Sequence, residues 1–108
     1  MSQSGAIVEL EPAEVRARLA RKEIVLVDVR EANETATERI AGALSMPLSG
    51  FDPAALPGGD ASRVVFHCAG GKRSALAVAR CRAAGVPACM HLRGGIAAWK
   101  AAGLPTER

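Results

Sequence analysis

The sequence is poor in aromatic residues and has no long apolar run. Phe, Trp and Tyr make up only 3% of the 108 residues, and tyrosine is absent. Aliphatic side chains and alanines must therefore fill the core. The shortage also argues against nucleic-acid binding, because the stacking of bases uses aromatic side chains. No apolar run approaches the roughly 18 residues of a membrane span, so we expect no membrane segment.

Cysteines are few, and their spacing is unlike that of a disulfide framework. The chain has three, Cys68, Cys81 and Cys89, with no CxxC pair. An odd count without that spacing argues against both disulfide staples and a zinc site. The segment Met1–Gly5 lacks the basic and apolar parts of a secretory signal. We therefore expect reduced thiols, no bound metal and a cytoplasmic location.

The remaining composition is that of one globular domain spanning residues 1–108. Hydrophobic residues make up 49% and charged residues 23%. The hydrophobic pattern predicts strands at 6–10, 24–29, 43–48, 63–67 and 88–92. It predicts helices at 11–21, 33–40, 74–84 and 96–102, a helical turn at 51–56 and a surface turn at 57–60. This alternation predicts an α/β fold with a mostly parallel sheet.

Charge is unevenly divided along the chain. Residues 1–62 carry a formal charge of −4 and residues 63–108 carry +7. A positive field favours anionic substrates and speeds their encounter. Charge alone is equally consistent with an ordinary basic surface.

The segment from Cys68 to Ser74 has the composition of an anion-binding loop. Cys68 ends a hydrophobic strand, Gly70 and Gly71 follow, and Lys72 and Arg73 come at the expected start of a helix. Glycines let the backbone curl and turn several N–H groups inward. The positive end of the helix and the two cations add to that field. All of these effects stabilise a thiolate, so the pKa of Cys68 should fall below its reference of about 8.5.

The alternative is that Cys68 is a buried core cysteine beside an ordinary turn. A lone cysteine favours that interpretation, because cysteine is often buried. The combination of thiol, glycines and cations reverses the balance, since a purely structural turn needs neither the cations nor the thiol.

Four motifs, in order, resemble the rhodanese domain, a family of sulfurtransferases. The resemblance extends from about Ile7 to Pro105, and no single motif is specific by itself. The matching stretches are Val27-Asp28-Val29-Arg30-Glu31, Ile40 to Pro47, Cys68 to Ser74, and Leu92-Arg93-Gly94-Gly95-Ile96-Ala97-Ala98-Trp99. The chain departs from the family at Glu38-Arg39, where glycine–histidine is usual, and this affects local conformation more than activity.

The resemblance implies a fold, a reaction and a set of site residues. The fold is a three-layer α/β arrangement with helices on both faces of the sheet. Cys68 takes sulfane sulfur from thiosulfate or a similar anionic donor and passes it, as a persulfide, to a thiol, cyanide or protein acceptor. The loop residues Ala69, Gly70, Gly71, Lys72, Arg73 and Ser74 hold the persulfide and donor. Arg73 is expected to bind the donor more strongly than Lys72, and no metal or organic cofactor is needed.

Other polar residues are expected to be structural. Asp28 should accept backbone N–H bonds at its strand end, and Arg30 should pair with Glu34 or Glu31. His67 and His91 are expected to be packed or edge histidines, because His67 points away from its neighbour Cys68 in a strand. Cys81 and Cys89 are expected to be small core residues, and Trp99 to anchor the last helix.

Two other functions share some of these features. A phosphatase or arsenate reductase of related fold also uses a cysteine in an anion-binding loop that ends in arginine. Here four residues separate Cys68 from Arg73, whereas the loop of protein tyrosine phosphatases is one residue longer. The shorter ring suits a sulfur atom better than a tetrahedral oxyanion. A non-catalytic binding module is the other alternative, and such modules often lack the cysteine.

Overall fold

Five short strands form one parallel sheet with the order β1-β5-β4-β2-β3. The computed structural model describes residues 7–57 and 59–108. Ala6 of the expected first strand, the segment Met1–Gly5 and Gly58 of the expected surface turn lie outside these ranges. Within them, no helix has the length and apolar character needed to cross a membrane.

The elements follow the predicted alternation of strand and helix. The strands are β1 (Val8–Leu10), β2 (Val25–Asp28), β3 (Leu44–Ser45), β4 (Val64–His67) and β5 (Met90–Leu92). The helices are α1 (Pro12–Ala20), α2 (Ala32–Thr37), α3 (Lys72–Ala83) and α4 (Gly95–Ala101). Short 3₁₀ turns cover Leu48–Gly50, Pro53–Ala55 and Ala61–Arg63.

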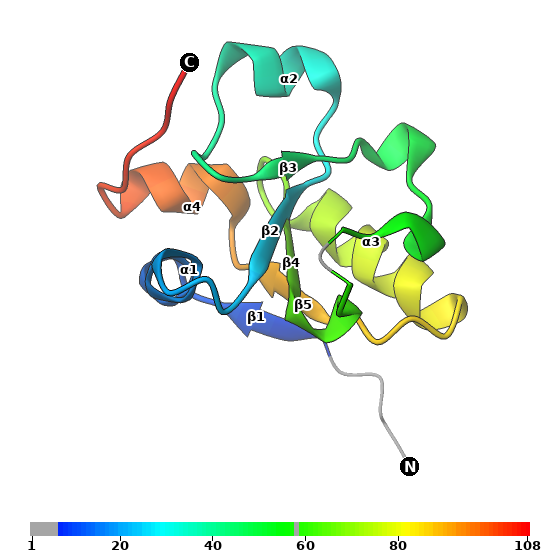
Figure 1. The fold of residues 1–108 in the computed structure, drawn as a ribbon. Coiled ribbons are helices and arrows are strands. Elements are labelled where there is room, and N and C mark those ends of the chain that lie inside the picture. The colour runs from blue at the N-terminus through cyan, green and yellow to red at the C-terminus, as the bar shows by residue number, and fades with distance from the viewer. Residues whose placement is uncertain (1–6, 58) are drawn as a thin grey trace.

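Helices cover both faces of the sheet, which confirms the expected three-layer arrangement. Helices α1 and α4 lie together on one face and α3 lies on the other (Figure 1). Successive residues of β4 alternate between two cores: Val65 packs on the α1–α4 side, and Val64 and Phe66 pack on the α3 side. Trp99 of α4 is 3% exposed and anchors its helix in the first of these cores, as expected.

Several predicted elements have different bounds in the structure, and α2, β3 and α3 are among them. Helix α2 ends at Thr37 rather than near residue 40, because Arg39 pairs with Glu107 in an antiparallel bridge and Ile40 turns into the core. Strand β3 covers only Leu44–Ser45, since Pro47 has no N–H to donate and a 3₁₀ turn follows. Helix α3 begins at Lys72, two residues before the expected start, which places Lys72 and Arg73 in its first turn.

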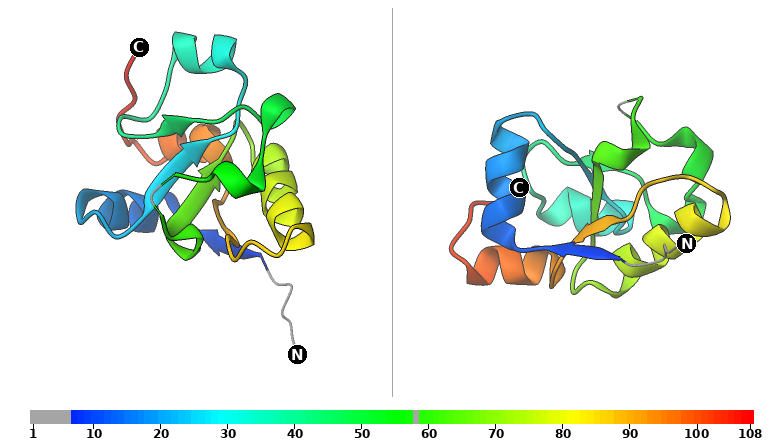
Figure 2. Two further views of the ribbon diagram at one scale, coloured as in Figure 1. Left: turned by 45° about the vertical axis from the view of Figure 1, so that its right-hand side comes forward. Right: turned by 90° about the horizontal axis from the view of Figure 1, so that it is seen from below.

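The parallel pairing brings the carboxyl ends of the strands to one edge of the sheet. The connections from β4 to α3 and from β5 to α4 leave this edge next to each other (Figure 2). In open α/β sheets such an edge is where ligands bind. Cys68, the first residue after β4, lies there.

Candidate active site

Backbone N–H groups surround the sulfur of Cys68. The N–H of Gly71 donates to Cys68 Sγ over 3.1 Å, and the N–H of Ser74 donates over 3.3 Å. Gly71 reaches this position with φ of +108°, in the left-handed region that glycine tolerates. Gly71 is the N-cap residue of α3 and Ser74 lies in the first turn, so the positive end of that helix is directed at the sulfur.

Burial and hydrogen bonding act on Cys68 in opposite directions. Burial raises the pKa of the thiol, because the side chain is only 1% exposed. Hydrogen bonds from the backbone and hydroxyl of Ser74 and from the backbone of Gly71 and Gly70 lower it. The hydrogen bonds prevail, so the pKa of Cys68 lies below its ordinary value, as the sequence predicts.

The loop is fixed from behind by the start of α4. The N–H of Ile96 donates to the carbonyl of Cys68 over 2.9 Å, and that of Ala97 donates to Ala69 over 3.1 Å. This contact requires glycine at position 95, where a Cβ atom would lie 2.3 Å from the Cys68 carbonyl oxygen. The residues after the Gly94–Gly95 turn therefore bind the carbonyl groups of the Cys68 loop. The N–H groups of that loop remain available to the sulfur.

The two loop cations differ in their surroundings. Arg73 donates from both terminal nitrogens to the carboxylate of Glu34, over 2.6 and 3.0 Å. These bonds from Arg73 are the main reason that the pKa of Glu34 falls to about 2. Lys72 is exposed and forms no ion pair with any residue in the described ranges. Arg73 therefore ties α3 to α2, while the charge of Lys72 is open to solvent.

Asp28 and Arg30 form a buried pair at the end of β2. Asp28 accepts the backbone N–H of Arg30, as expected, and Arg30 also donates its side chain to Asp28 over 2.8 Å. The prediction that Arg30 pairs with Glu34 or Glu31 is therefore wrong. These two glutamates instead cap α2, and Glu34 binds Arg73. Burial raises the pKa of Asp28, but the Arg30 bonds outweigh it and keep that carboxyl ionised.

The two histidines lie on opposite faces of the sheet. His67 is fully buried with Nε2 3.6 Å from Asp28, and neither ring nitrogen has a hydrogen-bond partner among the described residues. Burial lowers its pKa and keeps the ring neutral. His91 is also buried, but its Nδ1 lies 2.8 Å from Ser74 Oγ, beside the Cys68 loop.

The sequence-predicted residues thus separate into three groups. Cys68, Gly70, Gly71 and Ser74 converge on the sulfur, while Ala69 positions the loop through its carbonyl. Lys72 and Arg73 lie at its rim, and Asp28 and Arg30 support the neighbouring strand end. The sequence predicts that His91 is a packed or edge histidine. Its contact with Ser74 depends on strand order, which the sequence does not reveal.

The side-chain chemistry at this edge is that of a thiolate in a ring of donors. Within residues 7–57 and 59–108, no cluster of three or more His, Cys, Asp or Glu side chains has the geometry to hold a metal. Cys68, Cys81 and Cys89 are all free thiols. Cys81 is buried as predicted, whereas Cys89 is exposed, so the prediction that Cys89 is a core residue is wrong. The arrangement suits nucleophilic attack by sulfur on an anionic substrate, with the N–H groups stabilising the anionic product.

The chain is similar in sequence to a known domain family and to proteins from other organisms. The family model of the rhodanese-like domain matches residues 11–102. A protein of unassigned function from Synechocystis sp. is 40% identical over 101 residues, which cover 94% of this chain and 56% of that protein. The chain therefore spans little more than half of that relative.

Two further relatives carry functional names. A sulfurtransferase from Allochromatium vinosum is 36% identical over 99 residues, covering 90% of this chain and 92% of that protein. The crystal structure of a thiosulfate sulfurtransferase from Pseudomonas aeruginosa superposes with a TM-score of 0.83 at 31% identity. That match covers 94% of this chain and 20% of the other.

Proposed function

Because the chain belongs to the rhodanese-like domain family, we propose that it is a sulfurtransferase that carries sulfane sulfur on Cys68. The observation that carries the proposal is the pair of N–H groups, from Gly71 and Ser74, directed at Cys68 Sγ over 3.1 and 3.3 Å. Donors placed around a sulfur stabilise a thiolate and, one atom further out, a persulfide anion.

The first half-reaction is a displacement at sulfur. The Cys68 thiolate attacks the outer sulfur of thiosulfate or a similar donor and forms a new S–S bond. The original bond of that sulfur breaks, and sulfite leaves with the electron pair. In the second half-reaction a thiol, cyanide or protein acceptor attacks the outer sulfur of the persulfide and regenerates the thiolate.

Lys72 is the main cation for the donor in this proposal. The forked guanidinium of Arg73 is better suited than an ammonium group to bind an oxyanion. The sequence therefore predicts that Arg73 binds the donor more strongly than Lys72. In the structure Glu34 occupies both terminal nitrogens of Arg73 and offsets its charge. Lys72 stands beside the loop with its charge exposed, so the larger share of donor binding passes to it.

The short loop supports sulfur rather than phosphate as the transferred group. Only four residues separate Cys68 from Arg73, and the N–H groups already lie within hydrogen-bonding distance of the bare sulfur. A tetrahedral oxyanion needs a wider ring. Three free thiols also fit a reducing compartment, so we place the protein in the cytoplasm.

The test is the intact mass of the protein after incubation with thiosulfate. We expect a gain of one sulfur atom that cyanide or a thiol reductant removes. Cys68→Ser should gain nothing, whereas Cys81→Ser, which replaces another buried cysteine, should behave as the wild type. Modification at Cys81 or Cys89, or hydrolysis of aryl phosphates without a persulfide, would contradict the proposal.

A further inference from the structure

A chain of hydrogen bonds runs from Cys68 to the protein surface. Cys68 Sγ lies 3.6 Å from Ser74 Oγ, and Ser74 Oγ lies 2.8 Å from His91 Nδ1. On the other side of the ring, His91 Nε2 lies 3.2 Å from Glu9 Oε2. Ser74 and His91 are buried, whereas half of the Glu9 side chain is exposed. The chain thus joins a buried sulfur to solvent in three contacts.

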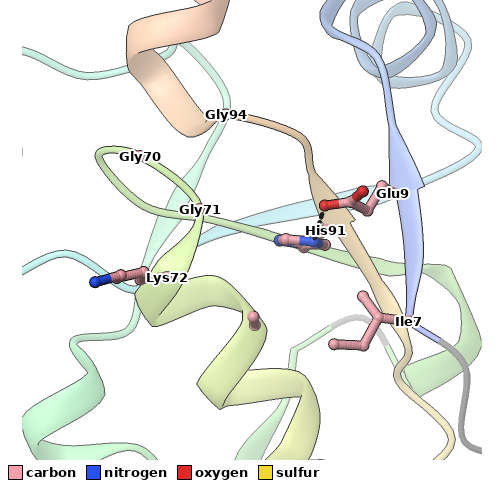
Figure 3. A pocket seen from close by; sticks show the side chains of 8 residues that line it. Ile7, Glu9, Gly70, Gly71, Lys72, His91 and Gly94 are labelled. Atoms are coloured by element: carbon pink, nitrogen blue, oxygen red, sulfur yellow. Dashed lines mark hydrogen bonds and ion pairs between the residues drawn. The ribbon is translucent and has the colours of Figure 1, made fainter.

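Three separate elements bring these groups together. Glu9 of β1 pairs directly with His91 of β5 in the parallel register, so both side chains project from the same face of the sheet. Ser74 is in the first turn of α3, which covers that face. Figure 3 shows Glu9 beside His91, opposite Gly70, Gly71 and Lys72. These residues line an open cleft of about 440 Å³, which gives the outer end of the chain access to water.

The hydrogen positions follow from Glu9. An ionised carboxylate only accepts hydrogen bonds, so His91 Nε2 carries the hydrogen and the neutral ring leaves Nδ1 bare. Nδ1 then accepts the hydrogen of the Ser74 hydroxyl. The carbonyl of Gly71 is the competing acceptor for that hydrogen, at the longer distance of 3.2 Å. The Ser74 oxygen remains open to the thiol hydrogen of Cys68.

We propose, building on the proposed function, that Ser74, His91 and Glu9 form a proton relay that receives the thiol proton of Cys68. The S–H bond breaks as the proton moves to Ser74 Oγ, and the Ser74 hydrogen moves to His91 Nδ1. The products are a thiolate and an imidazolium, so no atom or charge is lost. The hydroxyl of Ser74 then donates to the thiolate, and Glu9 balances the charge on His91. His91 is a positioning residue that acts through Ser74.

The relay solves a problem that burial creates. Cys68 is 1% exposed, so bulk water has little access to its proton. The N–H groups of the loop stabilise the thiolate once it has formed, but they cannot take up a proton. The relay supplies the acceptor.

Few other charged groups face His91. Glu9 on β1 favours the imidazolium, whereas Lys72 at the start of α3, across the same cleft, opposes it. Among the described residues on this face, Cys68 is joined to His91 through Ser74, and the thiol of Cys81 lies in the same buried core as Cys68. His67 of β4 and its partner Asp28 belong to the other face, and Arg93, the next charge along the chain, is directed at Glu11.

The test is the rate at which iodoacetamide alkylates Cys68 between pH 5 and 10, followed by peptide mass mapping. His91→Asn keeps an oxygen that can accept from Ser74 but cannot take up a proton. We expect its alkylation at pH 7 to fall about tenfold, with recovery at high pH, where the thiol ionises without a paired imidazolium. Ser74→Ala, which retains its backbone N–H, should show the same shift. A His91→Asn profile that superposes on the wild type overturns the relay.

Glu9 provides a second variant with little risk to folding. Glu9→Gln should shift the alkylation profile in the same direction by a smaller amount, and an unchanged profile contradicts the relay even if His91→Asn does not fold. Glu11→Gln is the matched control, since Glu11 is an exposed acid two residues along that pairs with Arg93. Alkylation needs no sulfur donor. A protein with the expected profiles that gains no sulfur from thiosulfate therefore retains the relay and refutes only the sulfur-transfer proposal.

Discussion

Lys72 and Arg73 are neighbours in the first turn of α3, but only one of them is paired. Glu34 holds the Arg73 guanidinium, while the Lys72 ammonium is exposed at the rim of the Cys68 loop. A charge-assisted contact to a substrate is worth about 1.5–3 kcal/mol when well formed, and less at an exposed position. The two cations should therefore contribute unequally to donor binding.

Replacing Lys72 should weaken the use of thiosulfate more than replacing Arg73. We expect Lys72→Ala to raise the KM for thiosulfate about tenfold, or about 1.4 kcal/mol, and Arg73→Ala to raise it about threefold. Steady-state kinetics with thiosulfate and cyanide measures both. Lys100→Ala is the control, because it removes an equal charge from the last turn of α4. A larger effect of Arg73→Ala would return the main role to the guanidinium.

Between elements, the Arg73–Glu34 pair fastens α3 to α2 across 39 positions of sequence. The pKa of Glu34 falls from 4.5 to about 2, first because Arg73 donates to its carboxylate. A folded-state pKa below the unfolded value means stability that is present above pH 4.5 and is lost as pH falls through 2. Both side chains are about one-third exposed, so solvent reduces the effect.

Arg73→Ala should accordingly lose stability in a pH-dependent way. At pH 7 we expect a loss of about 1 kcal/mol in the free energy of unfolding. The difference from the wild type should shrink as pH falls from about 4.5 through 2, below which Glu34 is protonated in both proteins. Urea denaturation at several pH values measures it, with Glu34→Gln as the complementary variant. A difference that stays constant over this range would show that the pair is not the cause.

The turn between β5 and α4 is a second contact between elements on which the site depends. A Cβ atom at Gly95 would lie 2.3 Å from the Cys68 carbonyl oxygen and 2.6 Å from that of Ala69. Both partners are backbone atoms, so the clash can be relieved only by moving α4 away from the loop. The φ of +62° adds strain for any side chain.

Gly95→Ala should therefore destabilise the fold and disturb the site together. We expect the free energy of unfolding to fall by about 2–4 kcal/mol because of strain and overpacking. We also expect slower alkylation of Cys68. Gly103→Ala is the matched control, because Gly103 has a similar φ of +79° but open space around it. Gly103→Ala should lower the free energy of unfolding by about 1–2 kcal/mol and leave the alkylation rate of Cys68 unchanged. Equal costs at the two positions would refute the backbone clash.

Over the whole molecule, positive charge is concentrated in the half of the chain that builds the loop. Residues 63–108 carry +7 and include α3, whereas residues 1–62 carry −4. Such a field attracts a doubly charged donor over a range set by salt, about 10 Å at 0.1 M.

Thiosulfate use should consequently depend on ionic strength. We expect kcat/KM for thiosulfate to fall about threefold between roughly 10 mM and 0.15 M salt. Alkylation by iodoacetamide, which is uncharged, is the control and should change little over the same range. An equal response of the two reactions would indicate that salt acts on the thiol and not on donor attraction.

The sequence by itself determined the class of fold and the position of the proposed nucleophile. Continuous runs such as Val64 to His67 are typical of strands in a parallel sheet that is covered on both faces, and such runs are visible in the local sequence. The Cys68–Ser74 loop is equally local, because its glycines, cations and helix start are consecutive. Its hydrogen bonds to Sγ therefore follow closely from composition and order.

Tertiary structure alone decided which distant residues meet around that loop. His91 contacts Ser74, and Glu9 contacts His91, because β1 and β5 pair in one particular register at the edge of the sheet. Glu34 binds Arg73, and Arg30 is left to Asp28, because of how α2 and α3 sit relative to each other. Each of these pairings depends on strand order and on helix placement. Residues far apart in the chain can be brought together in many ways, so the local sequence does not indicate which of them meet.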